Sequence, residues 1–125
     1  MCGIVGYVGD KQAARFLIEG LTKLEYRGYD SAGIAVYNGE SDAIRVEKSV
    51  GRLAELEKKI DGNVPVGCMG IGHTRWATHG GPSDLNSHPH TDCTGDFAVV
   101  HNGIIENYLA LKEELIEAGH VFKSE

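Results

Sequence analysis

The sequence predicts one mixed α/β domain. Short runs of apolar and β-branched residues alternate with segments in which apolar residues recur every three or four positions, the spacing of amphipathic helices. The chain has 125 residues, of which 42% are apolar and 24% are charged, which is the length and balance of a single globular domain. It contains no internal repeat or low-complexity segment. We therefore expect residues 1–125 to form one unit with a core of its own.

The first half predicts a strand, a helix, a hairpin and a second helix. "GIVGYVG" at 3–9 is almost continuously apolar, which is typical of a buried strand. Apolar residues at helical spacing run over 12–25, and Gly28 is well placed to end that helix. "AGIAVY" and "AIRVEKSV" are joined by the turn-forming "NGES", a pattern that predicts a β-hairpin. "GRLAELEKKI" at 51–60 predicts a short helix.

The second half is interrupted by a long polar segment. We expect a strand within 66–76, where glycines would let another layer or a ligand come close. Residues 77–96 contain two prolines and three histidines without periodicity, and a loop of that length in a small domain is usually functional or mobile. A strand over 97–103 and a helix over 107–119 follow, with the helix ending at its glycine. "HVFKSE" at 120–125 predicts the start of another strand.

Composition excludes several classes of partner. The formal net charge is −6, with 18 acidic and 12 basic residues, which works against binding to nucleic acid or anionic lipid. No apolar stretch is long enough to span a bilayer, and the first ten residues lack the pattern of a signal peptide, so we expect a cytoplasmic protein. Cys2, Cys68 and Cys93 have no disulfide or CxxC spacing, so we expect free thiols, with Cys68 in the core.

Cys2 is a candidate nucleophile because of its place in the chain. If Met1 is removed, Cys2 carries a thiol and a free α-amino group on one residue. Amines of that kind titrate near pH ~8 and thiols near ~8.5, so the amine can serve as the base for the thiol. Gly3 would let a substrate approach from the side. An exposed or lipidated N-terminal cysteine is the alternative, and the first three residues alone favour it.

Asn102 and Gly103 are candidate donors to an oxyanion. They stand at the end of a predicted strand in "HNG", where a side-chain amide and a backbone N–H can face the same point. Each donor of this kind is worth about 10²–10³ in rate. Asn-Gly more often marks a simple turn, but here a helix follows it rather than a second hairpin strand.

"HTRWATHG" contains candidate substrate-binding residues. The Arg75 guanidinium matches a carboxylate, the polar side chains of Thr78 and His79 could complete recognition, and Trp76 could cover the site. This set would suit an amino-acid substrate. For an arbitrary Arg-Trp pair, a surface charge and a half-buried packing residue would be the more common outcome.

A zinc-binding module is the rival interpretation of the histidine-rich region. His73, His79, His88, His90 and Cys93 offer imidazole and thiol ligands. Their spacing matches no standard zinc pattern and no HExxH motif is present. We therefore expect no metal at the site and no cofactor.

Five segments in consistent order carry a resemblance to a known family. They are "CGIVGYVG" at 2–9, "LEYRGYDSAG" at 24–33, "GIGHTRWATHG" at 70–80, "NSHPH" at 86–90 and "VVHNGIIEN" at 99–107. On these motifs the chain resembles the class II glutamine amidotransferases, and within them the glutaminase domain of the branch that forms amino sugars. The resemblance implies an N-terminal nucleophile hydrolase fold, with two stacked antiparallel sheets between helical layers.

The resemblance also implies a role for residues around the nucleophile. By it, Cys2 attacks the side-chain amide of L-glutamine, giving glutamate and ammonia. Asn102 and Gly103 fall on the family's oxyanion-hole positions. Arg27 matches a position that helps to orient the nucleophile.

For the substrate, the resemblance implies a pocket for the glutamine α-carboxylate. Arg75, Thr78 and His79 fall on the positions that hold this group. Trp76 falls on the loop that closes over the site and gates the path of ammonia.

The resemblance implies partners outside these residues as well. Family members continue with an aspartate for the glutamine α-ammonium and further strands, so 1–125 is expected to be the N-terminal part of a truncated glutaminase domain. The sugar-isomerase domains that bind fructose 6-phosphate are absent, so the conversion to glucosamine 6-phosphate and the homodimer belong to the full-length enzyme. A non-catalytic fragment with the same fold is therefore a second hypothesis, and we expect weak or no glutaminase activity from the 125 residues alone.

Overall fold

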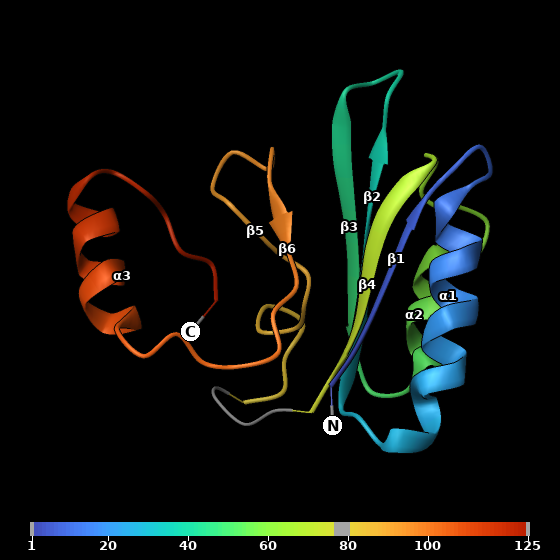
Figure 1. Cartoon of the computed structure of the whole chain (residues 1–125), viewed down its shortest axis with the longest axis horizontal. Coiled ribbons are helices and arrows are strands. Elements are labelled where there is room, and N and C mark those ends of the chain that lie inside the picture. Colours follow the sequence, from blue (N-terminus) through green and yellow to red (C-terminus); the bar gives the residue numbers. More distant parts are fainter. Residues whose placement is uncertain (1, 77–80, 125) are drawn as a thin grey trace.

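A four-stranded antiparallel sheet forms the centre of the fold in the computed structural model (Figure 1). The structure describes residues 2–76 and 81–124, apart from the side chain of Arg27. In spatial order the strands are β1 (Gly3–Val8), β4 (Met69–Arg75), β2 (Ser31–Asn38) and β3 (Ala43–Val50). The predicted hairpin of β2 and β3 is confirmed, as are the strands at the start of the chain and before the long loop.

Two helices cover one face of this sheet, α1 (Ala13–Leu24) and α2 (Leu53–Ile60) (Figure 1). The predicted helices are confirmed, and α1 continues into a short 3₁₀ turn, η1 (Glu25–Arg27), which ends at Gly28 with a φ of 77°. Their apolar stripes meet the sheet in a core that comprises Ala13, Ala14, Leu17, Leu21, Ala32, Ile34, Val36, Leu53, Leu56 and Ile60. The predicted close approach at the glycines of β4 is also confirmed, because a Cβ on Gly70 would lie 2.8 Å from the Leu17 side chain.

The opposite face carries a smaller second sheet and a third helix. β5 (His90–Thr91) pairs with β6 (Ala98–Val99), and α3 (Tyr108–Glu117) lies beyond them (Figure 1). The layers therefore run α, β, β, α, the arrangement expected for an N-terminal nucleophile hydrolase. Within the described residues, no helix has the length and apolar character needed to cross a membrane.

Four expectations from the sequence are corrected. β1 is an edge strand rather than a buried one, and Val8 near its end is 80% exposed. The strand predicted over 97–103 shrinks to two residues, and the described part of 120–125 contains no strand. Cys68 is exposed and does not belong to the core. These errors share a cause. Each expectation depended on which element a strand-like segment would pack against, and the local sequence does not determine that neighbour.

Candidate active site

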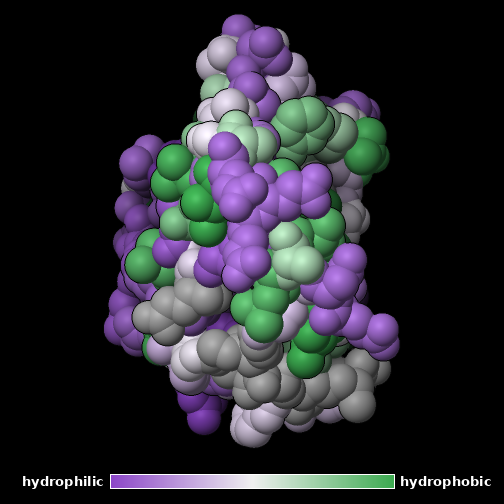
Figure 2. Space-filling view, turned by 90° about the vertical axis from the view of Figure 1, so that its left-hand side faces the viewer, coloured by the Kyte–Doolittle hydropathy of each residue, from purple (hydrophilic) through white to green (hydrophobic). Residues whose placement is uncertain are grey.

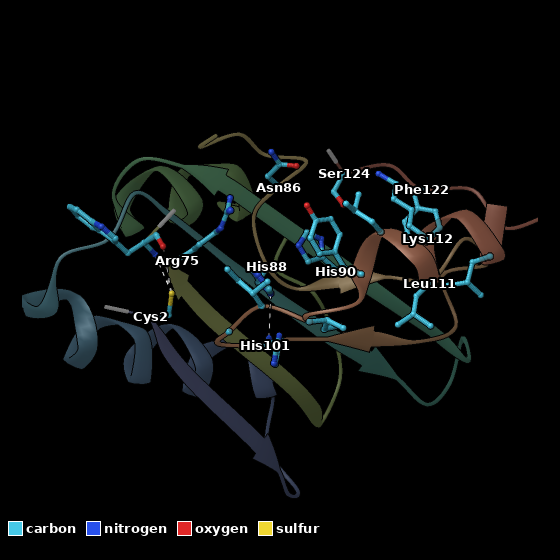
Figure 3. A pocket seen from close by; sticks show the side chains of 17 residues that line it. Cys2, Arg75, Asn86, His88, His90, His101, Leu111, Lys112, Phe122 and Ser124 are labelled. Atoms are coloured by element: carbon cyan, nitrogen blue, oxygen red, sulfur yellow. Dashed lines mark hydrogen bonds between the residues drawn. The ribbon is translucent and has the colours of Figure 1, made fainter. Parts of the chain in front are cut away.

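Cys2 lies where the first strand enters the sheet, beside the end of β4 (Figure 3). The backbone N–H of Trp76 donates to the Cys2 sulfur over 3.3 Å, and that sulfur lies 3.8 Å from the Trp76 carbonyl oxygen. The next residue is fixed as well, because the Gly3 N–H donates to the buried Thr74 hydroxyl over 3.2 Å. The partly exposed thiol is therefore held by paired backbone rather than by a flexible chain end.

Asn102 is brought next to Cys2 from a distant part of the chain. Its Nδ2 donates to the Cys2 carbonyl oxygen over 3.2 Å, and its Oδ1 lies 2.6 Å from Nε2 of the buried His73. Gly103 follows with a φ of 151°, in the region that favours glycine, and a Cβ there would lie 3.2 Å from the His101 ring. The two predicted oxyanion donors thus follow each other beside the predicted nucleophile.

Arg75, the last residue of β4, and Trp76, which follows it, lie on the same side of the site as Cys2. Arg75 is only 7% exposed, and its Nη1 donates to the Gly81 carbonyl over 3.4 Å. Trp76 is 52% exposed, and a Cβ on Gly28 would lie 3.7 Å from its ring. Arg27 therefore precedes a glycine that faces Trp76, while nothing is described of the Arg27 side chain.

The two remaining predicted residues, Thr78 and His79, lie outside the described residues. The described chain resumes at residue 81, whose carbonyl accepts the hydrogen bond from Arg75. Of the three residues that the sequence assigns to the carboxylate pocket, the structure therefore describes only Arg75.

A cavity of about 560 Å³ opens in front of the thiol. Cys2 and Arg75 border it from the main sheet, and residues of α3 border it from the other side, with His88 and His90 between them (Figure 3). Apolar side chains are exposed on the α3 side of the molecule (Figure 2). Those on α3 are Leu109, Leu111, Leu115 and Ile116. The cavity is large enough for an amino acid and combines charged, polar and apolar walls.

Three imidazole rings contact one another in series, tilted by 31° and 60°, and two of them, His88 and His90, line the cavity; we call this series the histidine stack. The ring centroids of His73 and His88 are 4.3 Å apart, and those of His88 and His90 are 4.4 Å apart. Burial, followed by the neighbouring His73 and His90, lowers the pKa of His88 to about 3, and burial followed by Lys48 lowers the pKa of His90 to about 4. Burial is also the largest cause of the lowered pKa of His73, and the Arg75 charge adds to it. All three rings are therefore neutral at pH 7.

The zinc-binding interpretation names these three histidines, Cys93 and His79, of which His79 lies outside the described residues. Across 2–76 and 81–124, no three His, Cys, Asp or Glu side chains are grouped so as to hold a metal ion. Cys93 lies apart from the stack, with its sulfur 3.6 Å from Nδ1 of His120.

The segment that follows the undescribed residues is tied to the sheet by polar contacts. Lys48 on β3 donates from Nζ to the Ser87 carbonyl over 2.9 Å. Asp84 accepts from the Val50 N–H over 2.8 Å and from Lys59 Nζ over 2.6 Å, and these donors lower the pKa of its carboxyl. The His88 carbonyl lies directly over Gly33, where an added Cβ would approach it to 2.1 Å.

Two contacts of the site were missed at the sequence level. Thr74 holds the residue after the nucleophile, and His73, considered only as a metal ligand, holds Asn102. Strand alternation offered a partial signal, since His73 and Arg75 must share one face of β4 and Thr74 must take the other. The partners themselves depend on pairing between distant segments.

Comparison with known proteins gives a consistent result. No protein-family model matches the chain. The whole chain is 63% identical over 126 aligned residues to glutamine–fructose-6-phosphate aminotransferase (isomerizing) of Caldanaerobacter subterraneus subsp. tengcongensis, and covers 20% of that relative. It is 58% identical to the protein of the same name from Pyrococcus horikoshii and covers 21% of it. The chain thus spans about a fifth of the length of these relatives.

Solved structures agree on the fold. The glutamine phosphoribosylpyrophosphate amidotransferase from B. subtilis matches 98% of the chain with a TM-score of 0.77 at 28% identity, over 26% of its own chain. The allosteric regulatory enzyme of purine biosynthesis matches 99% of the chain with a TM-score of 0.79 at 29% identity, over 27% of its own chain. Over its whole length, the chain therefore corresponds to the N-terminal part of the glutamine–fructose-6-phosphate aminotransferases, with the fold of the N-terminal nucleophile amidotransferases.

Proposed function

We propose that the chain supplies the glutamine-hydrolysing chemistry of an amidotransferase, with residues 1–125 as the N-terminal part of a glutaminase domain. The observation that carries the proposal is the convergence of two distant segments on Cys2: Trp76 donates to the Cys2 sulfur over 3.3 Å, and Asn102 donates to the Cys2 carbonyl over 3.2 Å. These contacts bring two distant segments of the chain to Cys2, at a cavity that Arg75 also borders.

The proposed reaction begins with removal of Met1. The α-amino group of Cys2 then takes the thiol proton, and the sulfur attacks the side-chain amide carbon of glutamine. Asn102 Nδ2 and the Gly103 N–H donate to the oxyanion of the tetrahedral intermediate. Its collapse breaks the C–N bond, the leaving nitrogen takes the proton from the amine, and ammonia departs. Water then hydrolyses the γ-glutamyl thioester to glutamate and the free thiol.

Substrate recognition is assigned to residues around the cavity. Arg75 pairs with the glutamine α-carboxylate, since its planar guanidinium offers two parallel donors. Thr78 and His79 complete this pocket, Trp76 covers it, and Arg27 orients the nucleophile. Arg75 is held in place by burial, which reduces the entropy that it loses on binding.

In the longer protein, the ammonia would be transferred to fructose 6-phosphate. The support for this step is the printed name of the relatives, which act on glutamine and fructose 6-phosphate, and the identity of 55–63% with them. The formation of glucosamine 6-phosphate, the homodimer and the cytoplasmic location are part of the same proposal.

A second candidate is a non-catalytic fragment that keeps the fold. Its support is the state of α3, which buries none of its residues, so the wall of the cavity opposite the thiol has little packing to hold it in place. Under this hypothesis the chain keeps Cys2 and Arg75 in place but does not hydrolyse glutamine.

Labelling with a glutamine analogue separates the two candidates. The chain is treated with 6-diazo-5-oxo-L-norleucine, its intact mass is measured, and the labelled residue is mapped by peptide sequencing. We expect one added label on Cys2 of a chain that lacks Met1. Free glutamine should slow the labelling, because it occupies the same cavity.

Matched cysteine variants make the result specific. Cys2→Ser should abolish labelling, whereas Cys68→Ser and Cys93→Ser should leave it unchanged, because both of those thiols are exposed and border no part of the cavity. Absence of label on a chain without Met1 would contradict the enzymatic proposal and favour the fragment. Label on Cys68 or Cys93 alone would contradict it as well.

A further inference from the structure

A buried imidazole lies directly behind the proposed oxyanion donor. His73 is 0% exposed, and its Nε2 is 2.6 Å from Oδ1 of Asn102, whose Nδ2 is 3.2 Å from the Cys2 carbonyl oxygen. The three groups form a chain from the interior of the sheet to the residue that carries the thiol. The proposed reaction gives His73 no part in proton transfer.

The orientation of the Asn102 amide follows from hydrogen-bond polarity. The Cys2 carbonyl can only accept, so the Asn102 nitrogen must face it. The amide oxygen then faces His73, and two acceptors 2.6 Å apart would repel each other. Nε2 of His73 must therefore carry a hydrogen. The other ring nitrogen, Nδ1, is buried and has no hydrogen-bond partner among the described residues, so it can remain an unprotonated acceptor at lower cost than a buried donor.

We infer that His73 is a positioning residue that, as the neutral Nε2–H tautomer, fixes the Asn102 amide with its N–H groups toward Cys2. The inference deepens the proposed function and rests on it for the role of Asn102. One Nδ2 hydrogen is taken by the Cys2 carbonyl, and the second is the one offered to the oxyanion. If the amide turned over, an oxygen would face the developing negative charge and the donor would be lost.

The surroundings of His73 confine its ring, and burial lowers its pKa. Its ring lies against that of His88, with centroids 4.3 Å apart. On the sheet His73 is paired with Ile4 on one side and Gly33 on the other. Arg75, two residues further along the same face, disfavours a second positive charge nearby. The ring is thus a fixed, uncharged donor.

Two amide substitutions at position 73 separate this role from packing alone. His73→Gln can place an amide nitrogen near the position of Nε2 and keep the donor, whereas the shorter His73→Asn places it near Nδ1, out of reach of Asn102. We expect His73→Asn to slow the labelling of Cys2 by the diazo-ketone glutamine analogue about 10²–10³-fold, the effect of losing one oxyanion donor. His73→Gln should recover most of this loss.

Alkylation by iodoacetamide serves as the control, because it consumes the Cys2 thiol without forming an oxyanion. Both variants should be alkylated at Cys2 at the rate of the unaltered chain, while only His73→Asn reacts slowly with the diazo-ketone glutamine analogue. Equal losses in His73→Asn and His73→Gln, or no loss in His73→Asn, would overturn the inference. A parallel drop in iodoacetamide reactivity would also overturn it, since the defect would then lie in the thiol or the fold.

Nitrogen NMR of the unaltered chain tests the same point without any turnover. The ring-nitrogen shifts of His73 should report a protonated Nε2 and an unprotonated Nδ1 at pH 7. If this tautomer is found in a chain that neither hydrolyses glutamine nor accepts the label, the proposed function fails while the orientation of Asn102 stands. A protonated Nδ1 would overturn the inference whatever the activity.

Discussion

The backbone N–H of Trp76 points at the sulfur of Cys2 across 3.3 Å. The contact uses the main chain, and Trp76 as a whole is 52% exposed. The position of the sulfur therefore depends on where β4 ends rather than on which side chain follows Arg75.

Removal of this N–H should slow labelling at Cys2. Trp76→Pro deletes the donor, whereas Trp76→Ala keeps it and loses only the ring. A net hydrogen bond is worth about 0.5–1.5 kcal/mol and stabilises the reactive thiolate, so we expect Trp76→Pro to react with iodoacetamide about 2- to 12-fold more slowly than Trp76→Ala. Alkylation followed by mass spectrometry measures both. Identical rates would show that the contact does not fix the thiol.

The hydroxyl of Thr74 should contribute to stability from beneath the nucleophile. Thr74→Val removes the acceptor for the Gly3 N–H at nearly constant volume and leaves a buried donor unsatisfied, which costs about 1–3 kcal/mol in the free energy of unfolding. Thr74→Ser keeps the acceptor and should lose less. Urea denaturation of the three chains gives these differences. The expectation fails if the valine variant is as stable as the serine variant.

Gly33 should tolerate no side chain. A Cβ there would lie 2.1 Å from the His88 carbonyl oxygen, so Gly33→Ala must displace the backbone that carries the histidine stack. We expect a loss of about 1–3 kcal/mol in the free energy of unfolding and slower labelling of Cys2 by the glutamine analogue. Gly6→Ala is the matched control, because the nearest atom to a Cβ on that strand glycine is 4.0 Å away. Equal behaviour of the two variants would contradict the tight contact.

Acidification should destabilise the fold through the histidine stack. The pKa of His88 is lowered to about 3 and that of His90 to about 4, from an ordinary value of 6.5. Between pH 6.5 and 4, the unfolded chain therefore binds more protons than the folded chain, and the free energy of unfolding falls as the pH falls. Below that window Asp84, whose pKa is also lowered, adds a further loss on protonation.

A comparison of denaturation at pH 7 and pH 4.5 tests this dependence. We expect His90→Gln to lose less stability between the two pH values than the unaltered chain. The variant lacks one of the histidines that take up a proton more readily in the unfolded chain than in the folded chain. His120→Gln, at an exposed position outside the stack, should show the full loss. A loss of the same size in all three chains would assign the effect to other groups.

Local sequence patterns were sufficient for most of the main sheet and its helices. The apolar spacing that includes Leu17 and Leu21 predicts α1, and these side chains are buried against the sheet. α3 illustrates the limit of this reasoning. Leu109 and Leu115 also predict a helix, and one is formed, but it buries none of its residues. Periodicity specifies a helix, and what the helix packs against depends on the rest of the fold.

The sequence proposed the members of the candidate site but gave no information on their contacts. Cys2, Asn102 and Gly103 follow from local chemistry and from the resemblance, and the structure brings Asn102 to Cys2. The role of His73 could not be read from the sequence, because it depends on a contact with Asn102, which is 29 positions further along the chain.

The buried apolar cluster lies wholly within residues 13–60, on the helix-covered side of the sheet. Residues 81–124, which supply Asn102 and most of the cavity wall, are joined to that sheet mainly through polar groups such as Lys48 and Asp84. Cooperative units with fewer buried apolar contacts open at lower free energy. Amide hydrogens of the second part should thus exchange with solvent well before those of β2 and α1. Thermal inactivation would then precede global melting, with the sheet still intact when the catalytic geometry is lost.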